Sequence, residues 1–175
     1  MQKIVLALAL CFSLLSSLSA QIKKAKPKQP VQTSSQEVTN VTNNIKMQSN
    51  GFKVESAYLV FEDETPVPPD NKVDVNQKVN LRIIVDSGWA IINDKVYPGA
   101  SEKIILSTGA VVLKSDDLFA AYTETGVSPE DARYITLKAI ITKIDDKRNH
   151  VIVTFKVWDK KGTSTITGSY KLYIK

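Results

Sequence analysis

Through the larger, C-terminal part of the chain, apolar and polar residues alternate with a period of two. Residues 78–86 (KVNLRIIVD) show this most clearly, since Val79, Leu81, Ile83 and Val85 fall on one side and mostly polar residues on the other. Successive side chains of a β-strand point to opposite faces of a sheet, so this period indicates a half-buried strand. A chain built this way has to bury one face of each strand against a second layer.

Six further segments are read as strands: 52–62, 101–107, 110–115, 133–144, 150–159 and 163–175. They are rich in β-branched and aromatic residues, which favour strands. Turn signals separate them roughly every 8–12 residues, including a short Thr-Gly turn between the second and third of the six. The pattern predicts an all-β fold, an immunoglobulin-like β-sandwich of about 7–8 strands.

One stretch between these strands has a helical pattern. Leu118, Phe119 and Tyr122 would share a helical face, and Ser115 precedes them as a candidate cap. A second turn is expected at Ser128, which is followed by a proline and then, three residues on, by an aspartate. We expect one or two short helical turns that cross one end of the sandwich and carry no chemistry.

The last 25 residues (VIVTFKVWDKKGTSTITGSYKLYIK) combine a strand, an Asp-x-x-Gly turn and a final strand with tyrosines. The residues that carry the pattern are Asp159, Gly162, Tyr170 and Leu172. In this respect the segment resembles the closing hairpin of secreted immunoglobulin-like and cadherin-like modules, which implies a sandwich fold. The chain lacks the cysteine pair of antibody-type domains. It also lacks the acidic calcium-binding motifs of cadherin repeats, so a calcium site is not implied.

The N-terminus begins with Lys3, continues with an apolar run (IVLALALCFSLL) and reaches small residues before Ala20. These are the three parts of a secretory signal peptide, and the run is too short for a transmembrane helix. We therefore predict a signal peptide over residues 1–20 and a secreted, periplasmic or cell-surface location. The alternatives are a retained anchor or lipidation of Cys11, although Leu10 stands where lipidation requires a small residue. Cleavage would remove Cys11, the only cysteine, and with it disulfide and thiol chemistry.

Residues 21–50 (QIKKAKPKQPVQTSSQEVTNVTNNIKMQSN) are basic and polar, with few large apolar side chains. Such a segment buries too little surface to offset its ordering entropy, so we predict a disordered linker over 21–50 and a sandwich domain over 51–175.

Residues 1–50 hold six of the 23 basic and one of the 18 acidic residues, which leaves 17 of each in 51–175. A neutral domain is not typical of a nucleic-acid binder, and we exclude that class. No second segment is apolar for long enough to span a membrane.

Patterns for catalysis and metal binding are missing. His150 is the single histidine and lies between a turn and a strand, without the partners of a metal site or a catalytic triad. The acidic clusters at 62–64, 116–117 and 145–146 fall in turns or helix starts, where aspartate and glutamate are favoured anyway. We predict no catalytic residue, no metal and no cofactor, and hence no enzyme.

The segment 86–101 (DSGWAIINDKVYPGAS) contains the best candidate binding residues. Trp89 and Tyr97 flank an expected turn at Asn93 and Asp94, and we predict a binding site formed by these four. Exposed aromatic side chains on a loop can anchor a protein or stack on a sugar. The alternative for Trp89 is packing against the core, a role that Trp158 could also fill.

These features together predict a non-catalytic binding module that engages a protein partner in the cell envelope. The alternative is a carbohydrate-binding module that uses Trp89 and Tyr97. The free edge expected for the final strand, 163–175, would offer one route to a partner, because an exposed edge can accept a further strand.

Overall fold

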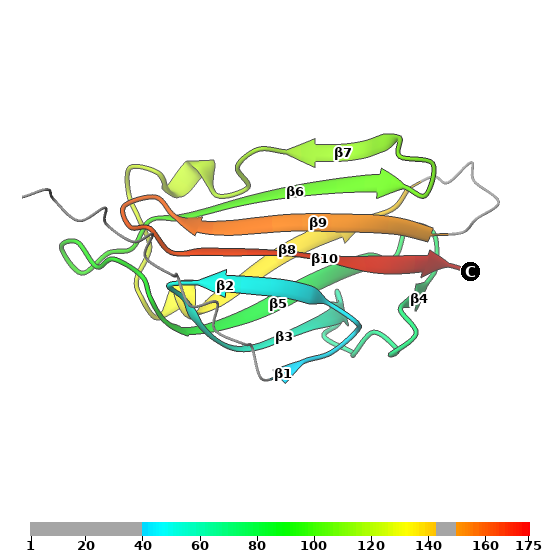
Figure 1. Ribbon diagram of the computed structural model, residues 1–175, viewed down its shortest axis with the longest axis horizontal. Helices are drawn as coiled ribbons and strands as arrows, with labels where there is room; N and C mark the ends of the chain where they lie inside the picture. The colour runs from blue at the N-terminus through cyan, green and yellow to red at the C-terminus, as the bar shows by residue number, and fades with distance from the viewer. Residues whose placement is uncertain (1–39, 143–149) are drawn as a thin grey trace, which may run out of the picture. The chain divides into compact units, whose positions relative to one another are not determined.

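The structure is a computed structural model and describes residues 40–142 and 150–175. Within these ranges the chain forms ten strands and two short 3₁₀ turns, and the strands make two packed sheets (Figure 1). The prediction of an all-β sandwich with one or two short helical turns is confirmed, with more strands than the expected seven or eight. The predicted signal peptide, residues 1–20, lies outside the described residues, as does the linker up to residue 39.

The smaller sheet has four strands in the order β1-β3-β5-β8. The strands are β1 (Asn40–Val41), β3 (Lys53–Phe61), β5 (Lys78–Ser87) and β8 (Tyr134–Ile140). The two-residue β1 runs parallel to β3, whereas β3, β5 and β8 are antiparallel to their neighbours.

The larger sheet has five strands in the order β2-β10-β9-β6-β7, and a sixth, β4, pairs with the end of β10. The strands are β2 (Lys46–Asn50), β4 (Lys72–Val73), β6 (Pro98–Leu106), β7 (Val111–Ser115), β9 (His150–Asp159) and β10 (Thr165–Ile174). The expected hairpin between β6 and β7 is present, and Gly109 in its turn has a φ of +91°.

The final strand, β10, is not the free edge that the sequence suggested. One side of β10 pairs with β9 from Thr165 to Tyr173. On the other side, residues Thr165 to Ser169 pair with β2, and Tyr173 and Ile174 pair with β4. Because both sides are occupied, β10 cannot accept a partner's strand without losing β2 or β4.

Residues 40–50, which the sequence analysis placed in the linker, form β1 and β2 in this structure. Of the apolar side chains in this segment, Ile45 is buried in the core, and Val41 and Met47 are partly buried and pack against it. The segment is also held by strand pairing and by buried polar contacts. A composition argument misses such a segment because it counts apolar residues and cannot see tertiary hydrogen bonds.

The two helical turns are η1 (Ala120–Tyr122) and η2 (Asp131–Arg133). The Ser128 hydroxyl accepts a hydrogen bond from the Asp131 amide at 3.0 Å, as expected of a cap. The predicted shared apolar face at the first turn is not formed, since only Phe119 packs against the core while Leu118 and Tyr122 are exposed.

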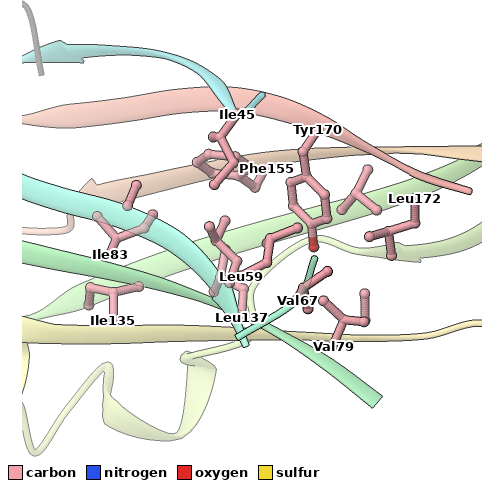
Figure 2. Close-up of a cluster of buried hydrophobic side chains, with 14 of the residues drawn as sticks. Ile45, Leu59, Val67, Val79, Ile83, Ile135, Leu137, Phe155, Tyr170 and Leu172 are labelled. Carbon is pink, nitrogen blue, oxygen red and sulfur yellow. The ribbon is translucent and has the colours of Figure 1, made fainter. Parts of the chain in front are cut away.

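The core lies between the two sheets and contains side chains from both (Figure 2). All four residues that the alternation of 78–86 placed inward are buried: Val79, Leu81, Ile83 and Val85. Tyr170 reaches from β10 into this core, and Figure 2 shows its hydroxyl directed away from its own strand and into the apolar cluster. The alternation therefore predicted the inward face of β5 correctly.

Two buried asparagines join the two sheets. The Asn43 side chain accepts a hydrogen bond from the Leu59 amide of β3 at 3.1 Å and donates one to Asn71 Oδ1 at 3.0 Å. The Asn71 side chain donates to the Asn43 carbonyl at 2.7 Å and to the Lys171 carbonyl of β10 at 2.9 Å. Both backbones lie in the left-handed region, with φ of 56° and 57°, which asparagine tolerates better than most residues.

A second polar pair lies in the core without such contacts. Glu102 of β6 and Tyr170 of β10 are both almost fully buried. Neither Glu102 Oε1 nor the Tyr170 hydroxyl has a hydrogen-bond partner among the described residues. Burial raises the pKa of Glu102 from its usual 4.5 to about 7, because the interior disfavours the charged form. Burial and the nearby Glu102 together raise the pKa of Tyr170 well above its usual value.

Replacing Asn71 tests the link between the sheets. Asn71→Gly keeps the left-handed backbone unstrained and removes three side-chain hydrogen bonds, so we expect the free energy of unfolding to fall by about 2–4 kcal/mol. Urea denaturation followed by circular dichroism measures this. The matched control is Asn76→Gly, another left-handed but exposed asparagine, which should change stability by less than about 0.5 kcal/mol. Equal effects of the two variants would contradict the role given to Asn71.

Glu102 makes a specific prediction about pH. Below about pH 4.5 both the folded and the unfolded chain hold this proton, so the carboxyl costs little. Between about pH 4.5 and pH 7 the unfolded chain is ionised while the folded chain still holds the proton, so up to about 3 kcal/mol of stability is lost over this range. Glu102→Gln cannot ionise, so it should match the parent protein at pH 4 and exceed its unfolding free energy by about 2–3 kcal/mol at pH 8.5. A constant difference between the two proteins from pH 4 to pH 8.5 would rule this out.

Candidate functional site

Residues 88–97 connect β5 to β6 and contain all four predicted binding residues, Trp89, Asn93, Asp94 and Tyr97. We call this segment the 88–97 loop. Its tip is a tight hairpin in which Ile92 and Lys95 exchange two backbone hydrogen bonds of 2.8 and 3.0 Å. Asn93 and Asp94 occupy the two central positions with φ of 50° and 57°. Positive φ at both positions is the geometry of a type I′ turn, for which asparagine and aspartate are well suited. The expected turn at Asn93 and Asp94 is therefore present.

Two isoleucines stand beside this turn and face solvent. Ile91 is 60% exposed and Ile92 is 42% exposed. The turn residues Asn93 and Asp94 and the adjacent Lys95 are exposed as well. The tip of the loop is thus a small apolar surface beside a polar turn.

Trp89 anchors the start of the loop to the core. Its ring meets the buried Phe52 edge-on, with centroids 4.5 Å apart and planes inclined by 63°. The side chain is half-buried and packs against the core cluster. Its indole Nε1 is buried without a hydrogen-bond partner among the described residues. Of the two alternatives for Trp89, this geometry corresponds to packing.

The hairpin turn between β9 and β10 supports the base of the loop. The buried Asp159 carboxylate accepts hydrogen bonds from the Ala90 amide at 2.6 Å and from the Lys161 amide at 2.9 Å. The Ser164 hydroxyl donates to the Gly88 carbonyl at 2.7 Å. Asp159, one of the residues behind the resemblance to immunoglobulin-like hairpins, therefore serves here to fasten a neighbouring loop.

Tyr97 closes the other end of the loop. Its carbonyl accepts a hydrogen bond from the Lys160 amide at 2.9 Å, and the Lys161 ammonium lies 5.2 Å from the centre of its ring. The preceding Val96 is buried and exchanges two backbone hydrogen bonds with Val127. The loop is therefore fixed at both ends and projects only its tip.

A partly buried ion pair lies next to this base. Lys160 Nζ is 2.7 Å from Asp117 Oδ2 and also donates to the Thr123 hydroxyl at 2.6 Å. Burial alone would raise the pKa of Asp117, but hydrogen bonds from Lys160, Phe119 and Ala100 outweigh it and lower the pKa overall. The lowered pKa favours the charged form of Asp117, and its carboxylate holds Lys160 and two backbone amides in place.

The other polar residues considered from the sequence are placed apart from the loop tip. His150 begins β9, an inner strand, and its ring lies 5.7 Å from that of Tyr173. In the 62–64 cluster, Glu62 pairs with Lys78, Asp63 accepts from Thr65, and Glu64 pairs with Arg82. The 145–146 cluster lies outside the described residues.

Two features are absent from the described part of the chain. No group of three or more histidine, cysteine, aspartate or glutamate side chains is placed to hold a metal ion. None of the helical segments in residues 40–142 and 150–175 has the length and apolar character that a membrane span requires.

The structure brings the four predicted residues into one loop but not to one surface. Asn93 and Asp94 are at the tip, whereas Trp89 and Tyr97 are at the base. The sequence analysis did not select Ile91 and Ile92, which are the exposed apolar residues of the tip. The sequence did contain a signal for them. Two neighbouring residues of an extended chain point to opposite sides, so of two adjacent isoleucines before a turn at least one was expected to face solvent.

No protein-family model and no curated protein matches the chain. Among solved structures, the C-terminal domain of wzt is similar over 75% of this chain and 78% of that one, with 12% identity and a TM-score of 0.47. An AA10 lytic polysaccharide monooxygenase from Streptomyces lividans is similar over 64% of this chain and 62% of its own, with 8% identity and a TM-score of 0.35. Likenesses of this size carry no argument about function.

Replacing Trp89 tests whether it belongs to the core. Trp89→Ala removes the contact with Phe52 and should lower the free energy of unfolding by about 2–4 kcal/mol. Trp89→Phe keeps an aromatic ring and removes the unpaired indole N–H, so we expect a loss of less than about 1.5 kcal/mol. Urea denaturation monitored by circular dichroism measures both. Unchanged stability of Trp89→Ala would show that the side chain does not depend on core packing.

Proposed function

We propose that this chain is a secreted or periplasmic, immunoglobulin-like binding module without catalytic activity, which recognises a protein of the cell envelope. The contact is made by the tip of the 88–97 loop, through Ile91, Ile92 and the turn at Asn93 and Asp94. The single observation that carries the proposal is the pair of exposed isoleucines on a turn whose base is fixed by Trp89, Asp159 and Tyr97.

Pre-organisation is what makes this tip suited to recognition. A loop that is already ordered loses little conformational entropy on binding, so more of the contact energy appears as affinity. Isolated exposed apolar side chains are common on protein surfaces. Two neighbouring ones on a projecting turn are better suited to insert into a partner's pocket, in the manner of the few anchor residues that dominate many interfaces.

Carbohydrate binding through Trp89 and Tyr97 is the alternative, and the geometry supports it less. Stacking on a sugar needs an accessible aromatic face. Trp89 instead packs against Phe52, and the ring of Tyr97 is met by the Lys161 ammonium. The groups that the tip does expose are aliphatic and favour a protein partner.

The absence of catalysis is part of the proposal and rests on how the nearby carboxylates are used. A catalytic acid or base needs access to a substrate proton. Asp159 is buried and accepts two backbone hydrogen bonds, while Asp117 is held in an ion pair with Lys160. Asp159 holds the start of the 88–97 loop, and Asp117 holds Lys160 and the amides of Ala100 and Phe119, so both carboxylates have structural partners.

Site-specific crosslinking in the native envelope tests the proposal. A photoreactive amino acid in place of Asp94 should capture a discrete protein in cells that produce the chain. Changing Ile91 and Ile92 to serine should reduce this product at least tenfold, because the apolar contact is lost, with folding checked by circular dichroism.

The matched control changes Val111 and Val112 of β7 to serine, since these valines are 54% and 42% exposed and lie away from the loop. The control should leave the crosslink within twofold of the parent protein. Equal loss in both variants would contradict a role of the loop tip. Capture of a glycan in place of a protein would favour the alternative.

A further inference from the structure

The outer face of the six-stranded sheet carries a set of lysines of which one alone, among the described residues, has an ion-pair partner. Each of its five longer strands contributes one exposed lysine: Lys46, Lys103, Lys114, Lys156 and Lys171. None of the outward-facing residues of these strands is acidic, since Glu102 and Asp159 are buried. We call the surface defined by these five lysines the basic face. Figure 1 shows the strands that bear it side by side, from β7 through β6, β9 and β10 to β2.

Strand register sets the spacing of the charges. Lys114 lies directly opposite Lys103, which is followed across the sheet by Thr154, Ser169 and Lys46. Neighbouring strands are about 4.8 Å apart, so this row spans about 19 Å. Lys156 lies two residues along β9 from Thr154, and Lys171 lies two residues along β10 from Ser169, each about 7 Å from the row.

The arrangement works against stability. Like charges placed directly opposite one another on adjacent strands repel, as Lys103 and Lys114 do. Lys114 is partly relieved by Asp116, whose carboxylate lies 2.7 Å from its ammonium. Within the described residues, Lys46, Lys103 and Lys171 have no ion-pair partner. A folding role therefore does not explain these lysines.

On the opposite surface of the molecule, the positive charges are compensated by neighbouring carboxylates. On and around the outer face of the four-stranded sheet, the cations each pair with a carboxylate. The pairs are Lys53–Asp86 at 2.7 Å, Lys78–Glu62 at 2.7 Å, Arg133–Glu55 at 2.8 Å, Lys138–Glu62 at 3.4 Å and Arg82–Glu64. The domain's neutral total thus conceals a separation of charge between two faces.

The basic face is polar along the two rows that hold Lys46, Lys103 and Lys156, whereas Ile152, Ile105 and Val111 lie across the sheet from Lys171. The outward residues of the polar rows and of the adjoining end of β10 are Gln48, Ser101, Thr154, Thr165, Thr167 and Ser169. Trp158 lies across Gly99, where a Cβ would come within 2.2 Å of the indole. Lys156 Nζ stands 5.7 Å from the centre of that ring. Shallow hollows of 390 and 250 Å³ lie beside Lys171 and between Lys103 and Lys114.

We propose that the basic face binds a linear polysaccharide that carries carboxylate or phosphate groups. The lysines pair with its anionic groups, and the hydroxyl and amide side chains bond its sugar hydroxyls. An anionic bilayer would share the charge, and Val111 at the edge of the face is an exposed apolar group, but the two rows that hold Lys46, Lys103 and Lys156 present hydroxyl and amide side chains, which suit a polysaccharide better than lipid. This site is separate from the 88–97 loop.

Binding of polygalacturonate to the full chain in 150 mM NaCl tests the proposal, with neutral dextran as the negative probe. The triple variant Lys103→Gln, Lys156→Gln and Lys171→Gln should raise the dissociation constant at least tenfold. The matched control is Lys53→Gln, Lys78→Gln and Lys138→Gln, which removes the same charge from the opposite face and should change it less than threefold. All proteins keep the basic segment 21–30, so its contribution is the same in each. In a Trp89→Phe background Trp158 is the only tryptophan, and its emission should shift when the polymer binds.

Each alternative outcome overturns the proposal. Equal weakening by the two triple variants would show that net charge matters and the face does not. No binding to polygalacturonate at 150 mM NaCl would remove the site. Binding to phosphatidylglycerol vesicles in preference to the polymer would assign the face to a membrane surface.

Discussion

The pairing of Asn43 with Asn71 is the contact on which the layout of the domain depends. Each asparagine occupies a left-handed backbone position and is buried, so its amide must find partners inside the protein. They find them in each other, in the Leu59 amide of one sheet and in the Lys171 carbonyl of the other. The loops that precede β2 and β4 are thereby fixed between the two sheets.

This fixation decides which strand edges remain open. Once the two loops are held, β2 and β4 lie along the outer side of β10 and complete its pairing. The larger sheet therefore ends at β2 on one side and at the five-residue β7 on the other. The covered edge also extends the outer surface by one strand, which brings Lys46 into line with Lys103.

The alternation of apolar and polar residues was sufficient to predict the sandwich and the inward face of β5, because burying one face of a strand depends on local order alone. The turn at Asn93 and Asp94, which the structure shows to be type I′, was predicted from an equally local signal. The strands within 40–50 were not predicted, since polar contacts with residues far along the chain hold them. Likewise, only tertiary packing reveals that Trp89 meets Phe52 while Ile91 beside it is exposed.

The net charge counted from the sequence likewise could not predict where the charges lie in the fold. Counting 17 basic and 17 acidic residues over 51–175 predicts a neutral domain, and the total is right. The total says nothing about where the charges lie. Five ion-paired cations lie on or around the outer face of the four-stranded sheet, whereas the lysines of the basic face, apart from Lys114, have no ion-pair partner among the described residues. Screening limits electrostatic contact to about 8 Å at physiological salt, so a partner meets the charge of one face and never the total. A neutral sum can therefore argue against long-range attraction to a polyanion, but it does not argue against contact with one.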